Sequence, residues 1–538
     1  MNRVARLLVL LGPCLLAAAL ALSGCRESPR SKAKPTTTPR PNLRVFVLGG
    51  AAGAVEPCGC VTNMLGGIDH AAALLQKGKS GAEGSLVLGA GPMFFQDPSL
   101  GAEAVAQARF KAETMAVSLH DLGLAAWAPG QNDWALGAET FRSLAKSAGA
   151  LPLAANLAAA AGTVSSSEVV SVSGLSVGLI GLSAPRAEGA LAGLAQEQPR
   201  EALGREMAAA SARGAKILIA LLAVPRGEAL RLVEQVPGLH LVILGKERDQ
   251  GETNDAPFEP ILVGRTLVVQ GQNHLQGVGM VDLFVRGGAY TFEDGTGLER
   301  AAERASLGRR MSQLERRIEK ARAPGSAASP GDLQTMERDL GQLKARDREL
   351  TQPRAPQSGS YFLYDLVEVR ESAGVDQGVA DRLLAYYQRV NEHNKQTFKD
   401  KTPPPAQAGE SSYVGVEQCT VCHQEERAFW DKTAHAKAYV TLEKVHKEFN
   451  LDCVSCHVTG YERPGGSTVT HVQGLTSVQC ENCHGPGSRH VENPSNDSYL
   501  TTKPTTALCP TCHHSPHVHD DWSAEEAFTK IVGPGHGR

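Results

Sequence analysis

The sequence of 538 residues predicts an α/β domain with a mixed sheet, followed by a small domain of helices and irregular chain. Three observations predict this arrangement. From Leu43 onward, apolar strand-like runs alternate with helical stretches, which is typical of α/β sheets. The charged segment 298–352 then repeats apolar residues at heptad spacing. Finally, eight of the 12 Cys and 12 of the 17 His follow residue 418, so the last quarter of the chain has a chemistry of its own.

The composition is that of a globular protein with room for several domains. Hydrophobic residues make up 42% of the chain and charged residues 21%, which excludes general disorder and a multi-span membrane protein. The formal net charge is -3. A chain without a strong basic field is not expected to have nucleic acid as its main partner.

The first 24 residues have the features of an export signal. Arg3 and Arg6 precede an apolar run at 7–22, and a short basic segment before such a run is typical of secreted proteins. The run is short for a membrane span, which makes a single transmembrane anchor the weaker alternative. It leads into the sequence Leu-Ser-Gly-Cys, ending at Cys25, which resembles a bacterial lipobox.

The lipobox resemblance implies that Cys25 becomes the lipidated first residue of the mature chain. Arg26 stands where many lipoproteins of the inner membrane have Asp, so the resemblance implies the outer membrane. Residues 25–42 are rich in Pro, Thr, Lys and Ser and are expected to form a flexible tether. We therefore expect the protein on the periplasmic side of a bacterial membrane, in a compartment that permits disulfides.

The α/β domain is predicted for residues 43–297 and is expected to be completed by residues 353–400. The expected strands are 43–48, 85–89, 175–182, 217–222 and 239–245, and the expected helices include 103–122, 138–148 and 200–213. The later strands 261–271, 277–285 and 361–369 have no helical pattern of this kind immediately between them. The second half of the domain is therefore expected to contribute antiparallel pairs to a mixed sheet.

The order of the loops after these strands resembles that of the calcineurin-like metallophosphoesterases, and within them the periplasmic 5'-nucleotidase type. The resemblance covers residues 43–293 and implies an α/β/β/α sandwich with a dimetal site. That family carries Asp-x-His, Gly-Asp, Gly-Asn-His and Gly-His-x-His motifs at the loops. The residues found here at the matching places are Gly50, Ala52, Pro92, Asn132, Asp133, Ala223, Lys246 and Arg248.

This set of residues does not suit two divalent cations, because hard metal ions at a shared site need carboxylates and imidazoles. Lys246 and Arg248 would repel the metals, and only Asn132 and Asp133 stay as weak candidate ligands. The resemblance therefore implies a phosphoesterase fold that has lost its metal centre. The glycine-rich turn at 49–53 does not match the dinucleotide-binding fingerprint either.

Cys58 and Cys60 stand in a glycine-containing loop after the first predicted strand. Ligand sites of open α/β sheets favour this edge. A C-x-C pair can bind a soft metal, form a strained disulfide or exchange electrons. We interpret the two thiols as a candidate redox pair, with a structural disulfide or inert thiols as the alternative.

Residues 298–352 predict a helical hairpin of the coiled-coil type. Its apolar seam consists of Leu307, Met311, Leu314, Ile318 and Ala321 in the first arm, and of Leu333, Met336, Leu340 and Leu343 in the second. Each arm is only about three heptads long, so local packing or a dimer contact is the expected role. Residues 401–411 contain a Pro-Pro-Pro run and are expected to link the α/β domain to the C-terminal domain.

The C-terminal domain, residues 412–538, carries four C-x-x-C-H motifs, the attachment pattern of c-type haem. They consist of Cys419, Cys422 and His423; Cys453, Cys456 and His457; Cys480, Cys483 and His484; and Cys509, Cys512 and His513. In this pattern the two thiols bond the porphyrin and the His is the proximal iron ligand. Zinc sites are the alternative, but zinc does not require a His after every pair. We therefore expect four covalently attached haems.

Other stretches of this domain resemble the tetrahaem cytochromes c of the cytochrome c-554 type. The matching stretches are 413–415, 433–436, 456–461, 478–480, 483–490 and 531–536, together with Trp430. The resemblance implies distal iron ligands at His435, His490 and His536. His471 is the fourth candidate, with His446 and His517 as alternatives. His on both sides of an iron favours electron transfer, whereas a five-coordinate iron would open a position for catalysis.

Together these features predict a lipid-anchored electron-transfer protein outside the cytoplasm. Its phosphoesterase-like domain is expected to dock redox donor or acceptor proteins. Two alternatives stay open: a haem oxidoreductase acting on a small nitrogen or sulfur compound at an open iron, and a 5'-nucleotidase-like phosphohydrolase with a cytochrome appendage. The sequence favours a carrier over an enzyme and leaves the oligomeric state open.

Overall fold

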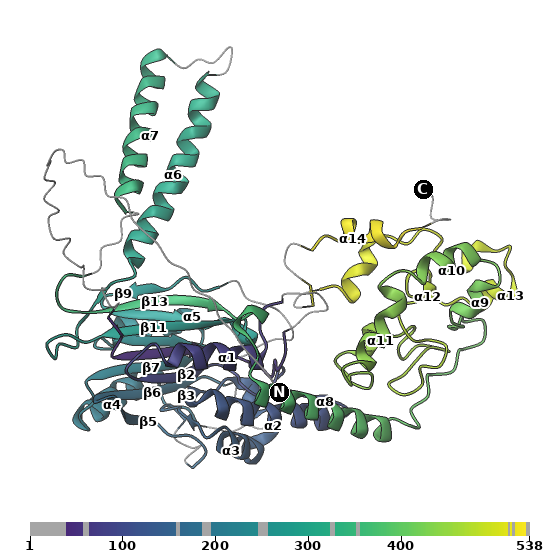
Figure 1. Ribbon diagram of the computed structural model, residues 1–538, viewed down its shortest axis with the longest axis horizontal. Coiled ribbons are helices and arrows are strands. Elements are labelled where there is room, and N and C mark those ends of the chain that lie inside the picture. Colours follow the sequence, from purple (N-terminus) through teal and green to yellow (C-terminus); the bar gives the residue numbers. More distant parts are fainter. Residues whose placement is uncertain are drawn as a thin grey trace, which may run out of the picture. The chain divides into compact units, whose positions relative to one another are not determined.

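Two β-sheets packed face to face form the centre of the N-terminal domain (Figure 1). The structure is a computed structural model. It describes residues 39–57, 64–157, 162–185, 195–245, 257–322, 329–350, 356–514, 517–518 and 522–533. Residues Arg40–Arg538 belong to one compact unit.

The first sheet has seven strands in the order β12-β13-β11-β1-β2-β3-β4. Their bounds are β1 Leu43–Leu48, β2 Ser85–Ala90, β3 Leu124–Ala128, β4 Leu151–Pro152, β11 Gly277–Phe284, β12 Phe292–Asp294 and β13 Ser360–Glu368. β1 runs parallel to β2 and antiparallel to β11, with Val45 opposite both Leu86 and Val281. The sheet is therefore mixed, and β13, after the hairpin segment, completes it as the sequence predicts.

The second sheet has six strands in the order β5-β6-β7-β8-β10-β9. Their bounds are β5 Ser167–Val172, β6 Leu175–Ser183, β7 Ile217–Ala223, β8 Leu241–Leu244, β9 Ile261–Val263 and β10 Thr266–Gln270. β6, β7, β8 and β10 are parallel neighbours. β7 is buried along its whole length, which explains why its sequence is an unbroken apolar run.

The inner faces of the two sheets bury one apolar core, and helices cover the outer faces. Val45 and Val47 of the first sheet pack with Ile219 and Leu221 of the second. The first sheet is covered by α1 Ile68–Lys79, α2 Val105–Leu122, α3 Gly137–Ala148 and α8 Gln377–Thr397, and the second by α4 Pro199–Ala212 and α5 Arg226–Gln235. The predicted α/β/β/α sandwich is confirmed.

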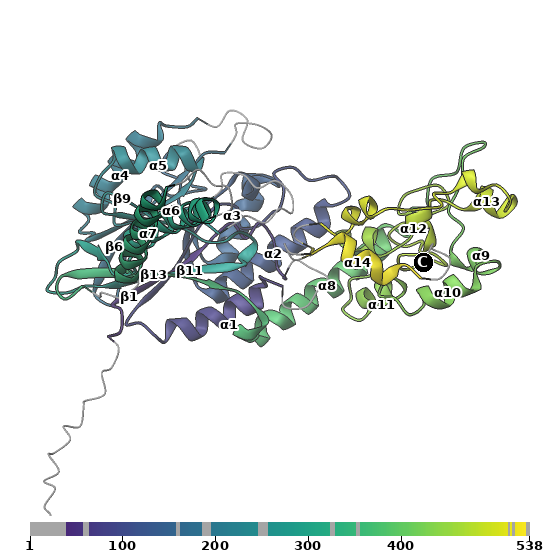
Figure 2. The same cartoon turned by 90° about the horizontal axis from the view of Figure 1, so that it is seen from above.

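The helices α6 Leu298–Arg322 and α7 Pro330–Leu350 pack together as the predicted helical hairpin. Figure 2 shows the two helices end on and side by side. All residues of the predicted apolar seam are buried or half-buried, whereas most other described positions are exposed. Ion pairs join the helices at Arg304–Asp347, 2.9 Å, and Lys344–Glu315, 2.8 Å. The charges of this segment therefore lie mainly on a solvated face.

One predicted strand differs from the structure. The segment 261–271 is not a single strand but a hairpin, in which β9 and β10 pair antiparallel with Val263 opposite Thr266. Gly264 between them has a φ of 62°, a conformation that glycine adopts without steric cost, so the chain reverses there. A single glycine inside a strand pattern is the sequence signal for such a turn.

The C-terminal region consists of short helices joined by irregular chain, as predicted. Its helices are α9 Val416–Thr420, α10 Gln424–Trp430, α11 Ala438–Glu443, α12 Cys480–His484, α13 Ser488–Glu492 and α14 Ala524–Ile531. Phe398, directly after α8, packs into the apolar cluster of this region beside Tyr439 and Val454. None of the helices in the described part of the chain is long and apolar enough to cross a membrane.

Candidate functional site

Four positions in the loops that would hold a dimetal centre carry side chains without donor atoms. Gly50, Ala52, Pro92 and Ala223 lie at or after the ends of β1, β2 and β7, where the sequence order predicts them, and all four are buried. Glycine has no side chain beyond a hydrogen, and the aliphatic side chains of Ala and Pro have no lone pair, so none of them can ligate a cation. Within the described residues, no three His, Cys, Asp or Glu side chains gather closely enough to hold a metal ion.

The carboxylate of Asp133 is occupied by hydrogen bonds within the chain. Its Oδ1 accepts from the backbone N–H groups of Met93 at 2.7 Å and Phe94 at 2.9 Å. Its Oδ2 accepts from Trp127 Nε1 and from the Gly130 N–H, both at 3.2 Å. Burial raises the pKa of Asp133 to about 6, although the four donors act in the opposite direction. Asp133 therefore fastens the loops after β2 and β3 to each other.

Several residues singled out in the sequence lie outside the described residues. They are Cys25, Cys58, Cys60, Lys246, Arg248 and His536. The lipidation site, the candidate redox pair and one distal ligand therefore stay predictions. Asn132, the second weak metal candidate, donates from its Nδ2 to the carbonyl oxygen of Gln96 at 2.5 Å.

All eight cysteines of the C-x-x-C-H motifs are free thiols. In two motifs a backbone carbonyl holds the His ring: His457 Nδ1 donates to Ala438 O at 2.7 Å, and His484 Nδ1 donates to Thr501 O at 2.8 Å. Because Nδ1 carries the proton, the Nε2 atom of each ring offers its lone pair to a metal. Free thiols and imidazoles in this tautomer fit the haem that the motifs imply.

His435 faces His513, the His of the fourth motif. Their ring centroids are 6.1 Å apart, a spacing that admits one iron atom between the two imidazoles. Trp522 stacks on His513 with a centroid distance of 5.0 Å and an interplanar angle of 11°. Burial, and after it the neighbouring His513, lowers the pKa of His435. The structure thus brings one predicted distal candidate opposite a predicted proximal ligand.

The other distal candidates have different surroundings. His490 has a buried Nδ1 without a hydrogen-bond partner in the described part of the chain, which leaves this nitrogen available to a metal. His471 Nδ1 lies 3.4 Å from Thr468 Oγ1. His446 is exposed, and His517 lines a cavity beside the second motif. These contacts favour His490 and leave His471 a prediction.

Thiols from different motifs lie within hydrogen-bonding reach of each other. The contact between Cys419 of the first motif and Cys480 of the third raises the pKa of Cys419 and lowers that of Cys480. A hydrogen bond with Cys512 of the fourth motif lowers the pKa of Cys456, of the second, to about 6. Cysteines of the first and third motifs, and of the second and fourth, are therefore neighbours.

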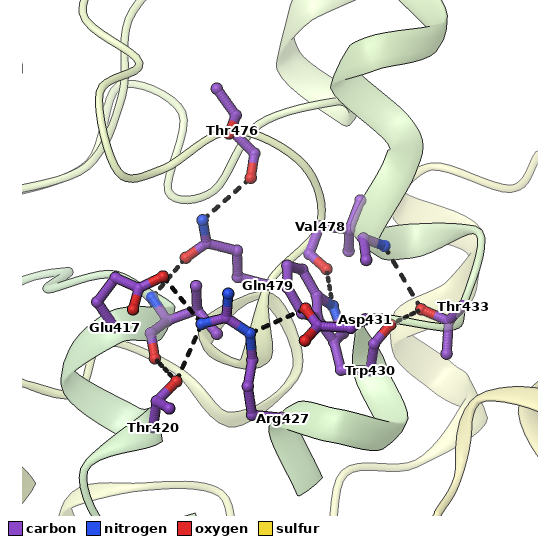
Figure 3. Close-up of polar contacts among 11 residues, drawn as sticks. Glu417, Thr420, Arg427, Trp430, Asp431, Thr433, Thr476, Val478 and Gln479 are labelled. Atoms are coloured by element: carbon purple, nitrogen blue, oxygen red, sulfur yellow. Dashed lines mark hydrogen bonds and ion pairs between the residues drawn. The ribbon is translucent and has the colours of Figure 1, made fainter. Parts of the chain in front are cut away.

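A polar network centred on Arg427 frames the first motif (Figure 3). Arg427 Nη1 donates to Glu417 at 2.9 Å and to Thr420 Oγ1 at 3.0 Å, while its Nε donates to Asp431 at 2.9 Å. Glu417 and Thr420 lie in α9, whereas Asp431 ends α10. The guanidinium therefore holds together the two helices that flank His423.

The same network ties the first motif to the chain before the third. Trp430 Nε1 donates to the Val478 carbonyl at 2.8 Å (Figure 3). The Val416 N–H donates to Gln479 Oε1 at 2.7 Å. The carboxylate of Glu481, inside the third motif, accepts from three backbone N–H groups, two of them just before α9. These bonds fix the position of the two motifs relative to each other.

A cavity of about 430 Å³ lies beside the second motif. The Cys and His residues of that motif line one side. The loop 52–57 after β1 and two tyrosines of α8, Tyr386 and Tyr387, line the other. Burial raises the pKa of both tyrosines above the usual range, so each keeps its hydroxyl proton. The carboxyl edge of β1, where an α/β domain carries its ligand site, therefore faces the second motif.

A protein-family model described as cytochrome c554 and c-prime matches residues 418–485, which include the first three motifs. A curated relative, cytochrome c-554 from Nitrosomonas europaea, is 38% identical over 96 residues, which are 15% of this chain and 41% of the relative. The match to this family implies covalently bound c-type haem, and the chain spans less than half the length of this curated relative.

Three solved structures are also similar to the chain. The 5'-nucleotidase precursor from Thermus thermophilus is 17% identical with a TM-score of 0.45, and the match covers 68% of this chain and 61% of that one. The sulfate thiohydrolase SoxB from the same species is 16% identical, TM-score 0.39, with 47% and 55% covered. The NAD nucleotidase of Haemophilus influenzae is 14% identical, TM-score 0.38, with 46% and 48% covered.

The sequence identified the motifs of the cytochrome domain but missed the residues that lie across the cavity from them. Tyr386 and Tyr387 belong to α8, which ends well before the second motif in the sequence, and their local pattern is that of a buried helix face. An adjacent pair of tyrosines in a chain with 5% aromatic residues is the one signal present. Their position becomes evident only when α8 is placed against the cytochrome domain.

Replacing Asp133 with Asn tests whether this carboxylate is structural. The amide NH₂ group would face two N–H donors and cannot accept hydrogen bonds from them. We therefore expect the free energy of unfolding to fall by about 2–4 kcal/mol. Denaturant unfolding measures the loss, with Glu139→Gln, an exposed carboxylate on α3, as the control. A variant as stable as the control would contradict the assignment. So would a cation-dependent phosphatase activity of the parent that the variant loses.

Proposed function

We propose that the protein is a lipid-anchored, extracytoplasmic tetrahaem cytochrome c that transfers electrons, fused to an α/β domain without a dimetal centre. The observation that carries the proposal is the set of four C-x-x-C-H motifs, in which His457 and His484 hold Nε2 available to iron. The family match at 418–485 supports covalent haem. Haem iron supplies one-electron chemistry, while the residues of the chain attach, orient and space the rings.

The contacts between motifs support electron transfer. Cys419 lies within hydrogen-bonding reach of Cys480, and Cys456 within reach of Cys512. Each thiol would become a thioether at the edge of a haem, so neighbouring sulfurs would bring the edges of two rings close together. An electron could then pass from ring to ring inside the cytochrome domain.

We assign His435 as the distal ligand of the haem on the fourth motif, and His490 and His536 as distal ligands of two others. The spacing of 6.1 Å between His435 and His513 supports the first assignment. The unpartnered Nδ1 of His490 supports the second. His471 is the candidate for the remaining haem.

The α/β domain is assigned the role of docking extracytoplasmic redox donor or acceptor proteins. The side chains at Gly50 and Pro92 have no donor atoms, and the Asp133 carboxylate is already bonded to four N–H groups. Both observations support the loss of a dimetal centre. Cys58 and Cys60 are the candidate redox pair of this domain. The lipobox-like sequence supports an anchor at Cys25 in the outer membrane.

The haems can be counted directly. Denatured protein from a host that matures c-type cytochromes should stain for haem and show the mass of the processed chain plus four haems. A variant with Cys509→Ser and Cys512→Ser should carry three, because the fourth motif loses both attachment points. Absence of covalent haem, or a count other than four in the parent, would refute the proposal.

Replacing His435 with Ala should remove one axial ligand from the fourth haem. We expect one of the four haems to change from low-spin to high-spin in optical and EPR spectra, with the haem content unchanged. His446→Ala is the matched control, because His446 is exposed in the same domain. A high-spin signal in the control but not in the His435 variant would reverse the assignment.

Replacing Cys25 with Ser should abolish lipidation, because the serine hydroxyl does not replace the thiol that carries the lipid. We expect the parent in the membrane fraction and the variant in the soluble periplasmic fraction. Cys14→Ser, within the predicted signal, should behave like the parent. Mass spectrometry of the N-terminal peptide shows the lipid, and a variant that stays with the membrane would argue against this anchor.

A further inference from the structure

The cavity beside the second motif has walls from both domains. Cys453, Cys456 and His457 line it from the cytochrome domain, and the loop 52–57 and Tyr386 line it from the α/β domain. A porphyrin attached to the two cysteines, with its iron on the His, must extend into the space next to these three residues. The placement of this haem rests on the proposed function, because it assumes that the second motif carries haem.

Buried amide side chains hold the segment before Cys453 against the α/β domain; we call this set of bonds the amide clamp. Gln107 of α2 donates to Asn450 Oδ1 at 3.0 Å and accepts from the Leu451 N–H at 2.9 Å. Asn394 of α8 donates to Gln107 Oε1 at 2.9 Å and to a backbone carbonyl of the same segment at 2.8 Å. The three amide residues are at most 3% exposed, and such buried polar contacts fix geometry.

Two ion pairs join the domains around the same cavity. Lys111 of α2 pairs with Asp452 at 2.5 Å, and Lys447 pairs with Glu56 of the loop after β1. Lys447 Nζ also lies 4.4 Å from the centre of the Tyr387 ring, within the range of a cation–π contact. The second motif is therefore held to the α/β domain on two sides of the cavity.

The hydroxyl of Tyr386 is buried in the cavity wall without a hydrogen-bond partner among the described residues. The residue is 3% exposed. A buried hydroxyl that lacks a partner destabilises a protein, unless a bound molecule supplies that partner. The charged groups that act on Tyr386 are Lys111, Asp452 and Glu56. All three are already engaged in ion pairs, Lys111 with Asp452 and Glu56 with Lys447. We therefore expect the occupant of the cavity to present an acceptor atom to Tyr386.

We propose that the second haem is bound between the two domains, and that the Tyr386 hydroxyl donates a hydrogen bond to an oxygen atom on it. That oxygen belongs to a haem propionate or to a ligand on the iron. The amide clamp sets the position of the attachment cysteines relative to this hydroxyl. The α/β domain thereby forms one wall of a haem pocket. Its residues affect the reduction equilibrium or the ligand affinity of one haem of the four.

The test uses the full-length Tyr386→Phe protein after its mass has confirmed four haems. If the oxygen is a propionate, loss of the donor leaves more negative charge beside the ring. The equilibrium constant for reducing one haem should then fall about tenfold. If the oxygen is on an iron ligand, carbon monoxide should instead leave one reduced haem about tenfold faster. Optical redox titration and carbon monoxide release separate these outcomes.

Two comparisons identify the haem concerned. Tyr364→Phe removes another buried hydroxyl without a partner in the described structure, on β13 and outside the cavity lining, and should change neither quantity. In a chain with Cys453→Ser and Cys456→Ser, which lacks the second haem, Tyr386→Phe should have no effect. A four-haem Tyr386 variant that differs from the parent in neither measurement overturns this proposal. Fewer than four haems in the parent overturns the proposed function instead.

Loosening the amide clamp gives an independent measurement. Asn394→Ala removes two of its buried bonds, so amide hydrogen exchange in the peptide 447–457 should become about tenfold faster in the four-haem protein. Gln388→Ala, at an exposed position of the same helix, is the control and should leave exchange unchanged. Exchange in the Asn394 variant as slow as in the control would overturn the placement of the second haem between the domains.

Discussion

Covalent haem attachment is the constraint on which the cytochrome domain depends. In the described part of this domain, the buried apolar cluster consists of Tyr439, Val454, Val458 and Val469, together with Phe398 from the end of α8. The α/β domain, in contrast, buries three large clusters around its two sheets. A domain with so little apolar side-chain surface gains little from hydrophobic burial on its own. Bound porphyrin would supply the missing apolar surface, which would link haem attachment to the folding of this domain.

In the cytochrome domain, hydrogen bonds and ion pairs position the C-x-x-C-H motifs, whereas apolar packing positions the elements of the α/β domain. Arg427 and Glu481 hold the first and third motifs, and Gln107 and Asn394 hold the second. Each such bond contributes modestly to stability but specifies distance and angle closely. Electron transfer between cofactors depends on their separation, so a domain of this kind needs defined geometry more than it needs a large margin of stability.

The sequence predicts a structural feature correctly where its pattern has a single physical cause. Buried parallel strands such as β7 require apolar runs, and four Cys pairs each followed by His point to haem. Asp133 was placed correctly at a strand end, but its bonding to four N–H groups depends on how the loops fold. Gln107 and Asn450 meet across 343 residues of chain, and no local pattern records such a contact. The unpartnered hydroxyl of Tyr386 is a property of the same assembled structure.

The amide clamp has a consequence for how the protein responds to ionic strength. Salt screens charged contacts over about 8–10 Å at ordinary concentrations, and docking between separate redox proteins through charged surfaces weakens accordingly. The side chains of the clamp are uncharged and buried, so salt has no charge to screen there, although the ion pairs beside them would weaken. Salt should therefore weaken the proposed docking of redox partner proteins more than the contacts of the amide clamp, which hold the proposed site of the second haem.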